Sequence, residues 1–597
     1  MSGQTLYPTA IAAAVGLFGT VAAIDDDPAA PDADWVTVTD APKWYVRPAG
    51  GSYGAEDGTS YEAAWEGFAA IQWASIQPGD TLYVAGTHYA QASNFYAFEV
   101  GAAGVSGSPI TIASCEIQYG ASTDDAGTIY GGRLWDTGGW TGPTNGVYSR
   151  STPATFNQFG LEADHTVLVR AADLAECEAT PGSLYMPAET GTITLYYHPT
   201  AALQPLIYFG ASPLRIQRDY VTVRGLRAFY AASTNGAVVI QRDAYAGVRR
   251  GVTVTECEVA YSINAAVNLT GSDAEDIVFS DNVVYDCSSG FYPLSQPGAV
   301  GYYHNRITVE RNEFYHTAQI EKRGPFYDSP GDECAIATQG GADHFMIRDN
   351  YIHDWHGEGI FLFQGGLGGT MTCNDATIVR NRVLMNSTEA GRTRMGICLG
   401  GFEWETDRGK RVLIANNLIT GSTYSSTSIG NNWCAALRLK PDKPTDPNDR
   451  MRVYNNTVVG AYYGIYAVPQ TADVAFGGDF KNNIIVDPDT DGWFVHHGND
   501  LDQSGIELNY NCYHGTGKFT WDAGTATTSF ATWKSNTGNT QDANSITGDP
   551  LFTGASDYTL QSGSPCVNAG TDTDLTDDLA GNPRPVGAYD IGAYERQ

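Results

Sequence analysis

A short pattern of alternating apolar residues that ends in an asparagine recurs through the middle of the chain. It has the form apolar-x-apolar-x-x-Asn-x-apolar, and one copy consists of Ile307, Val309, Asn312 and Phe314. Alternation with a period of two predicts short strands with one buried face. An asparagine directly after such a strand favours a turn, because its side chain bonds nearby backbone groups and tolerates left-handed geometry.

The pattern occurs ten times, with loose spacing and a strict local form. The first two copies carry Leu226 and Cys257 in place of the asparagine. The asparagines of the other eight copies are Asn282, Asn312, Asn350, Asn381, Asn417, Asn456, Asn483 and Asn511. We therefore expect stacked coils with a constant core, loops of variable length, and asparagine side chains that hydrogen-bond from coil to coil.

These repeats resemble those of the right-handed parallel β-helix (pectate-lyase-like) superfamily, which contains polysaccharide-processing enzymes and phage tailspike proteins. The resemblance implies an all-β solenoid. With strands about 4.8 Å apart, ten coils would extend for roughly 45 Å. A β-sandwich or a propeller is the alternative interpretation of many short strands.

Both ends of the chain also resemble those of β-helix proteins. Thr59 and Glu62 form a possible capping box before a helical stretch, residues 61–73, which we expect to be an amphipathic N-terminal capping helix. Residues 548–595 resemble the closing segment of bacterial β-helix proteins. Caps are expected because an open coil exposes unpaired strands.

The rhythm of the repeats divides the chain into five segments. Residues 116–215 are rich in aromatic residues and lack the asparagine pattern, which predicts a β-rich insertion. The expected segments are an N-terminal segment (1–42), an N-terminal cap with the first coils (43–115), the insertion (116–215), the parallel β-helix (216–515) and a C-terminal cap (516–597).

The N-terminal segment carries a second resemblance. Thr9 to Ile24 form an apolar run, but no basic residue precedes Lys43, so the positive region of a signal peptide is missing. The run is also too short and too rich in glycine for a membrane span. Residues 19–28 and 31–35 resemble a segment near the start of tailed-phage tail and fibre proteins, which implies docking onto a virion. Similar acidic stretches occur in extracellular bacterial proteins, so a role in export stays open.

Composition excludes several classes of partner. The 597 residues contain 34 Lys and Arg and 67 Asp and Glu, a formal net charge of −33. This charge repels phosphate backbones and anionic membranes, so we expect neither nucleic acid binding nor membrane insertion. The ten cysteines form no C-x-x-C pair, which excludes a zinc ribbon or a thioredoxin motif, and we expect reduced thiols in the core.

The resemblance implies that sugar-binding residues lie outside one sheet, between long loops. Ile336, Ile360 and Ile397 can be stacked in three successive coils, with Leu437 in the next coil. This alignment brings carboxylates and an imidazole to neighbouring coils, the components of general acid and base chemistry. The candidate catalytic residues are Asp332, Glu333, His356 and Glu358. The alternative is that these acids lie in turns because they are solvated.

A local excess of positive charge indicates a binding region for an acidic saccharide. Ten of the 34 basic residues lie between positions 380 and 443, and guanidinium groups match carboxylates in shape and charge. The candidate substrate-binding residues are Arg394, Arg438, Lys440, Trp355 and Trp404, the tryptophans as stacking surfaces for sugar rings. Ion pairing of the basic residues with neighbouring acids, and burial of the tryptophans, are the alternatives.

One acidic turn resembles part of a calcium loop. Asp487, Asp489 and Asp491 alternate before Gly492, but position 12 of the loop is Gly498 rather than Glu, so the match to an EF-hand fails. Weak Ca²⁺ binding is the only cofactor that the sequence suggests.

Together, the repeats and the two resemblances indicate a phage tail fibre or tailspike-type protein that binds, and in some cases also depolymerises, a host cell-surface polysaccharide. The resemblance to tailspike proteins implies a homotrimer in the virion tail that contacts phage tail or baseplate proteins. The alternative is an exported, extracellular bacterial polysaccharide lyase or glycoside hydrolase that acts as a monomer. A non-enzymatic adhesive rod is the third possibility.

Overall fold

The computed structural model describes residues from 43 to 597 with interruptions. The described ranges are 43–90, 95–115, 126–135, 137–154, 160–162, 168–187, 191–209, 211–231, 236–241, 247–270, 273–293, 304–317, 334–339, 342–355, 357–364, 373–385, 395–401, 410–421, 435–439, 446–467, 477–488, 491–497, 505–521 and 524–597. Residues 1–42, including the predicted N-terminal segment, lie outside them.

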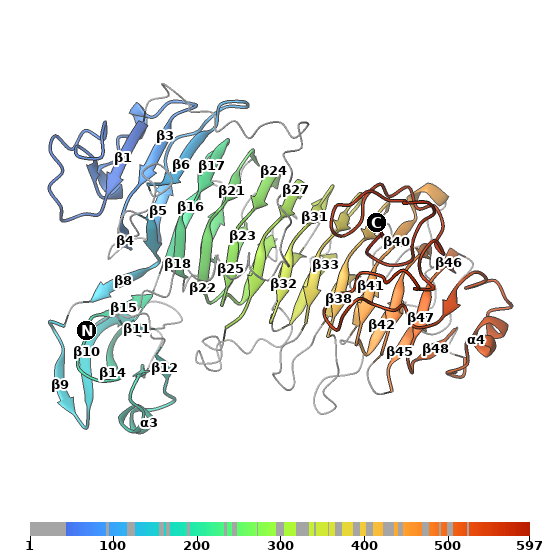
Figure 1. Ribbon diagram of the computed structural model, residues 1–597. Helices are drawn as coiled ribbons and strands as arrows, with labels where there is room; N and C mark the ends of the chain where they lie inside the picture. Colours follow the sequence, from blue (N-terminus) through green and yellow to red (C-terminus); the bar gives the residue numbers. More distant parts are fainter. Residues whose placement is uncertain are drawn as a thin grey trace. The chain divides into compact units, whose positions relative to one another are not determined.

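Three long parallel sheets wind together as a right-handed β-helix, as the sequence predicted (Figure 1). One coil runs from β27 (His304–Glu310) in sheet A to β28 (Glu313–Tyr315) in sheet B, then to β29 (Cys334–Gln339) in sheet C. The chain then returns to sheet A as β31 (Met346–Arg348), which pairs in parallel with β27. Each turn of the chain therefore adds one strand to each sheet.

Sheets A and B meet at a short turn and form two sides of the helix. In the described residues, sheet A contains β1 (Lys43–Arg47), β2 (Trp65–Glu66), β3 (Thr81–Val84), β6 (Ile110–Ser114), β17 (Val221–Arg224), β20 (Val248–Arg250), β21 (Thr253–Thr255), β24 (Asp273–Ser280), β27, β30 (Ala342–Asp343), β31, β34 (Thr377–Val379), β37 (Leu413–Ala415), β40 (Met451–Tyr454), β43 (Gly477–Lys481) and β46 (Gly505–Asn509). Sheet B contains β4 (Thr87–Tyr89), β7 (Thr128–Tyr130), β18 (Arg227–Ala231), β22 (Glu258–Ser262), β25 (Val283–Tyr285), β28, β32 (Tyr351–His353), β35 (Arg382–Leu384), β38 (Leu418–Thr420), β41 (Thr457–Val459), β44 (Ile484–Val486), β47 (Cys512–His514) and β49 (Ile546–Thr547).

Sheet C forms the third side, and its core residues lie in register. Its described strands are β5 (Tyr96–Val100), β16 (Ser212–Ile216), β19 (Val238–Ile240), β23 (Ala265–Leu269), β26 (Ser289–Pro293), β29, β33 (Glu358–Gln364), β36 (Met395–Gly401), β39 (Ala435–Leu439), β42 (Tyr463–Ala467), β45 (Trp493–His497) and β48 (Lys518–Thr520). Ile336 pairs with Ile360, Ile360 with Ile397, and Ile397 with Leu437. The predicted stacking of these four residues is confirmed.

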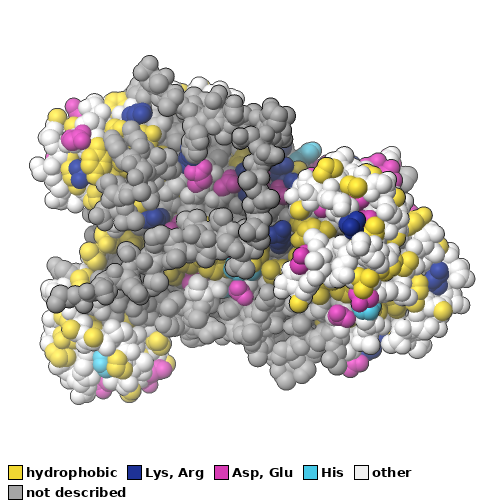
Figure 2. Space-filling model, in the orientation of Figure 1, with side chains coloured by type: hydrophobic (Ala, Val, Ile, Leu, Met, Phe, Trp, Pro, Cys, Tyr) yellow, Lys and Arg dark blue, Asp and Glu magenta, His cyan; other side chains and the backbone are white. Residues whose placement is uncertain are grey.

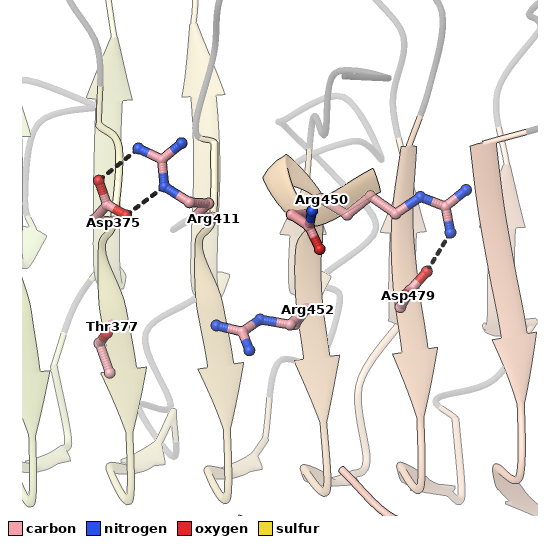
Figure 3. Close-up of a pocket in the computed structure, with 7 residues that line it drawn as sticks. Asp375, Thr377, Arg411, Arg450, Arg452 and Asp479 are labelled. Carbon is pink, nitrogen blue, oxygen red and sulfur yellow. Dashed lines mark hydrogen bonds and ion pairs between the residues drawn. The ribbon is translucent and has the colours of Figure 1, made fainter. Parts of the chain in front are cut away.

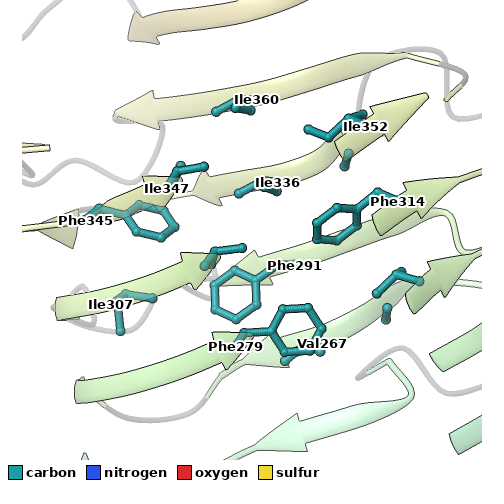
Figure 4. Packing of buried hydrophobic residues seen from close by; sticks show 14 of the residues in the cluster. Val267, Phe279, Phe291, Ile307, Phe314, Ile336, Phe345, Ile347, Ile352 and Ile360 are labelled. Atoms are coloured by element: carbon teal, nitrogen blue, oxygen red, sulfur yellow. The ribbon is translucent and has the colours of Figure 1, made fainter. Parts of the chain in front are cut away.

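Side chains from all three sheets meet in one continuous apolar core. Figure 4 shows Phe279 and Ile307 of sheet A, Phe314 of sheet B, and Phe291 and Ile336 of sheet C around the same interior. All five side chains are almost completely buried. Burial of apolar surface at about 25 cal/mol per Å² is the main force that holds the coils together.

The asparagines form a ladder inside the turn between sheets A and B. The Asn312 side-chain nitrogen donates to Asn350 Oδ1 at 3.0 Å, and the Asn312 backbone N–H donates to the same oxygen at 3.1 Å. The Asn350 side-chain nitrogen in turn donates to Asn381 Oδ1 at 3.0 Å. The predicted bonding from coil to coil is therefore present. The left-handed backbone conformation, however, belongs to the preceding residue, such as Arg311 (φ 53°) or Asp349 (φ 58°).

The N-terminal cap differs from the prediction. Residues 61–73 do not form an α-helix but contain β2 and the 3₁₀ helix η1 (Phe68–Ala70), followed by η2 (Trp73–Ser75). Trp65 pairs with sheet A and stacks on Trp44, with ring centroids 5.3 Å apart. Gly67 adopts a positive φ of 74°, which ends any helical path between these elements. Tertiary contacts thus override the local helix signal.

The β-rich insertion is present and is shorter than the predicted range. Strand β7 at residues 128–130 still belongs to the coils, since it pairs with β4 and β18. The insertion has one antiparallel sheet of three strands and one mixed sheet of five, in which β12 and β13 pair in parallel, and β16 then resumes sheet C. Its elements are β8 (Gly132–Trp135), β9 (Thr141–Thr144), β10 (Val147–Ala154), β11 (Gly160–Glu162), β12 (Val169–Arg170), α3 (Leu174–Ala179), β13 (Ser183–Tyr185), β14 (Gly191–His198) and β15 (Leu206–Phe209).

The C-terminal residues close the last coil and then fold back over earlier ones. Helix α4 (Phe530–Asn536) places Trp533 in the core, where it stacks on Phe519 with ring centroids 5.2 Å apart. Further along, Arg584 and Glu595 form a fully buried ion pair at 2.8 Å, and Arg584 also donates to Asn416 Oδ1. The C-terminal segment therefore binds the turn between sheets A and B.

Two further expectations concern cysteines and membranes. The nine described cysteines are all buried, and none forms a disulfide with another described cysteine, while Cys434 lies outside the described ranges. None of the helices in the described part of the chain has the length and apolar character needed to cross a membrane.

Candidate carbohydrate-binding face of sheet C

The outer face of sheet C carries a row of polar and aromatic side chains in register. Residues that alternate with the core residues of this sheet point outward, because side chains of a strand alternate between its two faces. From β33 to β48 this outer row consists of Phe361, Cys398, Arg438, Tyr466, His496 and Thr520. Successive members are therefore about 4.8 Å apart along the helix axis.

Arg438 is the cation of this row. Its side chain is only 7% exposed, and its guanidinium donates to the Cys398 sulfur at 3.5 Å. Burial raises the pKa of the neighbouring Tyr466, and the positive charge of Arg438 lowers it by a smaller amount. Arg438 and the Tyr466 hydroxyl therefore act on the same part of the surface, with the hydroxyl protonated at neutral pH.

Four aromatic rings contact one another beside Arg438 and form what we call the aromatic platform: Tyr463, Tyr466, Trp493 and His496. Tyr463 and Tyr466 stack with ring centroids 4.6 Å apart, and Tyr466 and His496 stack at 5.0 Å. Trp493 lies 4.7 Å from the His496 ring. Tyr463 and Tyr466 belong to an apolar cluster separate from the core, which agrees with their outward direction. Flat rings beside a cation have the chemistry that suits sugar rings, although Tyr463 and Tyr466 are each only 5% exposed.

His496 is neutral at physiological pH. Burial lowers its pKa to about 4. Its Nδ1 lies 2.8 Å from the Thr520 hydroxyl oxygen, so one ring nitrogen is held by Thr520. A neutral imidazole fixed in this way is competent to accept a proton.

Of the predicted catalytic residues, the structure describes Glu358. It begins β33, is 1% exposed, and its Oε2 accepts a hydrogen bond from the Cys334 thiol at 3.3 Å. Glu358 lies two strands from Arg438 in sheet C, about 10 Å along the helix axis, and is also three residues out of register with it along the strand. Asp332, Glu333 and His356 lie outside the described residues.

Of the predicted substrate-binding residues, too, the structure describes only some. Arg438 lies on the outer face of sheet C, whereas Arg394, Lys440 and Trp404 are not described. Trp355 is completely buried and packs against His316, with ring centroids 3.9 Å apart. The expectation that Trp355 stacks on a sugar ring is therefore wrong, because its side chain completes the core beside Phe314.

Pairing with acids accounts for part of the local positive charge. Arg380 binds Asp349 and Asp577, and Arg411 binds Asp375 and Asp449. Figure 2 likewise shows dark blue basic side chains beside magenta acidic ones where the surface is described. The ion-pair alternative therefore holds for these two arginines.

The calcium turn is described only in part. Asp487 and Asp491 both have positive φ angles, and Asp491 pairs with Lys518 at 3.1 Å. Asp489 lies outside the described residues, and in the described residues no three metal-ligating side chains converge. Two carboxylates, one already compensated by a lysine, fall short of the six to eight oxygens that Ca²⁺ prefers. Calcium binding stays a prediction.

Sequence reasoning missed the aromatic platform. The predicted stack of core residues in successive coils ended at Leu437, although the same alternation continues through Ile465 and Val495 in the next two coils. Extending the stack by these two coils would have placed Tyr466 and His496 in register with Arg438. The signal was therefore present in the sequence, but the asparagine spacing alone does not reveal which outer residues matter.

Comparison with known proteins supports the fold. Residues 220–432 match the family model "Right handed beta helix region". No curated protein matches the chain. Among solved structures, "The complex structure of XylC with xylose" is 11% identical with a TM-score of 0.53 and covers 93% of this chain and 98% of that chain.

Two further solved structures are similar at lower scores. A chain named "Glycoside hydrolase" is 9% identical with a TM-score of 0.47 and covers 70% of this chain and 94% of that chain. Pectate lyase Pel9A is 14% identical with a TM-score of 0.41 and covers 94% of this chain and 97% of that chain. The family match and the three parallel sheets together identify the body of the chain as a right-handed parallel β-helix.

Proposed function

We propose that this protein binds an acidic polysaccharide along the outer face of sheet C. The observation that carries the proposal is the position of Arg438 beside the aromatic platform on adjacent strands. Aromatic faces pack against the apolar faces of sugar rings, and a guanidinium binds a carboxylate through two parallel hydrogen bonds. A chain laid along the solenoid axis would place one acidic unit on Arg438 and its neighbour over Tyr463 and Trp493.

The reaction that suits these side chains is β-elimination at a uronate. Arg438 neutralises the carboxylate, which makes the hydrogen on the adjacent carbon more acidic. His496 takes that proton, and the electron pair forms a carbon–carbon double bond as the glycosidic oxygen leaves. The Tyr466 hydroxyl gives its proton to this oxygen and is then reprotonated by the His496 imidazolium. The two rings are stacked, so both proton transfers occur on one side of the sugar.

The test is digestion of purified polyuronates and bacterial capsules with wild type, R438Q and H496Q. Elimination yields unsaturated uronates that absorb in the ultraviolet. We expect H496Q to lose about 100-fold or more in rate with binding kept, and R438Q to lose binding and rate together. R224Q, which removes an exposed arginine paired with Glu256 on sheet A, is the matched control.

Other outcomes would change the proposal. New reducing ends without ultraviolet absorbance would replace elimination by hydrolysis. If the protein binds the polysaccharide but forms neither product, it is a binding protein and not an enzyme for that polymer. If R438Q binds the polysaccharide as well as wild type does, the binding site does not lie on sheet C.

The biological setting is a separate part of the proposal. A virion tail protein and an exported bacterial enzyme would both use this face, and the sequence resemblance of residues 1–42 favours the virion. In that setting the protein is a homotrimer that contacts tail or baseplate proteins. Cleavage of residues 1–24 in protein from its native host would instead support export, and a monomer in sedimentation analysis would contradict the trimer.

A further inference from the structure

A second polar cleft lies on the outer face of sheet A, on a different side of the helix from the sheet C face. It spans four neighbouring strands, β34, β37, β40 and β43. Its volume is about 420 Å³, which falls in the usual range for small-molecule sites. Figure 3 shows its lining, which consists of Asp375, Thr377, Arg411, Asn448, Arg450, Arg452 and Asp479.

Most charges in this cleft are already paired. Arg411 binds both carboxylate oxygens of Asp375, at 2.6 and 2.8 Å, and its remaining nitrogen contacts Asp449 at 2.6 Å. Arg450 donates to Asp479 at 2.7 Å. These pairs fix the two ends of the cleft and orient its walls.

Arg452 is the exception, because its exposed guanidinium has no partner among the described residues. Arg452 pairs in register with Leu413 on one neighbouring strand and with Asp479 on the other. The Asp479 carboxylate, however, accepts a hydrogen bond from Arg450 and a longer one from the Tyr454 hydroxyl. Figure 3 shows the Arg452 side chain between the two ion pairs. The cleft therefore offers one guanidinium that forms no ion pair with a described residue, beside three carboxylates that balance the charge of the three arginines.

The surroundings of Arg452 select the kind of anion. Carboxylates at both ends of the cleft, Asp375 and Asp479, disfavour a ligand with two negative charges. The Thr377 hydroxyl lies two strands from Arg452, and half-buried Leu413 lies between them in the same row. A hydroxyl and an apolar strip beside a guanidinium match a sugar ring that carries one carboxylate.

We propose that this cleft binds a single uronic acid residue, with its carboxylate on Arg452, a ring hydroxyl on Thr377 and its apolar face over Leu413. On a rod whose sheet C face holds a polyuronate, such a cleft would hold a second segment of polymer on another side. The cleft and the sheet C face share no residue, so either proposal can hold without the other.

The experiment is calorimetric titration of the full-length protein with glucuronate and galacturonate, with glucose as the neutral control and glucose 6-phosphate as the dianion. We expect a uronate-binding component that R452Q weakens at least tenfold and T377V weakens severalfold. R438Q should keep this component, which separates it from the sheet C face. Because Arg452 is exposed, R452Q should melt at the wild-type temperature.

Three results would overturn the proposal. The first is the absence of any uronate-binding component that depends on Arg452. The second is tighter binding of glucose 6-phosphate than of either uronate, since the flanking carboxylates should reject a dianion. The third is equal binding of glucose, which would show that the carboxylate does not matter.

Discussion

The ladder asparagines use every part of their amide groups. Asn350 Oδ1 accepts from the backbone and side chain of Asn312, and its nitrogen donates to Val309 O and Asn381 Oδ1. Its side chain is 1% exposed, so water cannot replace these bonds. A buried amide with four satisfied bonds fixes the turn and explains why the pattern tolerates no other polar residue well.

Replacement of one ladder asparagine tests this interpretation. We expect N350A to lower the free energy of unfolding by about 2–4 kcal/mol, because donors of Asn312 and the Val309 carbonyl lose their partner. Denaturant-induced unfolding followed by circular dichroism measures the change. N448A is the control, because the exposed Asn448 bonds only within its own turn to Asp446, and it should change stability by less than about 0.5 kcal/mol. Equal effects of the two variants would contradict the ladder's role.

A buried histidine gives a pH-dependent prediction. Burial lowers the pKa of His304 to about 4, and neither ring nitrogen has a partner in the described structure. The unfolded chain therefore binds a proton that the folded chain rejects between about pH 6.5 and pH 4, so His304 lowers stability as the pH falls through this window.

Removal of that imidazole should flatten the pH dependence. We expect the melting temperature of H304L to fall less than that of wild type between pH 7 and pH 5, and to equal or exceed it at pH 7. Differential scanning fluorimetry in matched buffers measures both. A slope that H304L leaves unaltered would refute the assignment.

At the scale of elements, the C-terminal segment (residues 569–597) does not form a further coil but binds coils that precede it. The buried Arg584–Glu595 pair anchors it, and Arg584 also binds Asn416 and the Gly592 carbonyl. Asn482 donates to Thr571 O at 2.7 Å, which adds a contact two coils further along. These bonds join positions up to 168 residues apart in the chain.

Breaking the buried pair should loosen this segment. We expect E595Q to destabilise the protein by about 3–5 kcal/mol, because Arg584 would remain buried without its counter-charge. Limited proteolysis should then cut within residues 569–597 before the coils. R596A, which removes an exposed charge next to the pair, should leave the cleavage rate as in wild type. Cleavage that begins in the coils would contradict the proposal that the buried ion pair anchors the C-terminal segment.

The elements show which parts of the structure follow from local sequence. The coils could be predicted because alternation fixes which side chains face the core, and Ile336, Ile360 and Ile397 pair as expected. The helix at residues 61–73 could not, because stacking of Trp65 on Trp44 outweighs local propensity. Of the site, Arg438 was found by its charge, whereas Tyr466 and His496 depend on register across coils.

At the scale of the whole molecule, net charge opposes the proposed ligand. A protein with a net charge of −33 repels a polyuronate at long range, although Arg438 attracts it at contact. Salt screens the long-range repulsion over a Debye length of about 10 Å at 0.1 M. Association should therefore be slow in dilute buffer.

This balance predicts an unusual salt dependence. We expect the association rate constant for a polyuronate to rise several-fold between about 10 mM and 150 mM salt, because screening removes more repulsion than attraction. Stopped-flow measurement of tryptophan fluorescence, with Trp493 in the platform as reporter, gives the rate. A neutral glucan serves as the control and should show no salt dependence. A rate that falls with salt would mean that a positive field guides the ligand.

The asparagine ladder also has a consequence for biosynthesis. Each rung joins residues only 25 to 39 positions apart, so a coil can form as soon as the next one has been made. The coils can thus fold in the order of translation, behind the ribosome. Residues 569–597 are made after these coils and bind Asn416, Asn455 and Asn482, so they stabilise coils that were completed earlier. A nascent chain that lacks residues 569–597 would therefore already contain coils, but not the contacts by which these residues stabilise them.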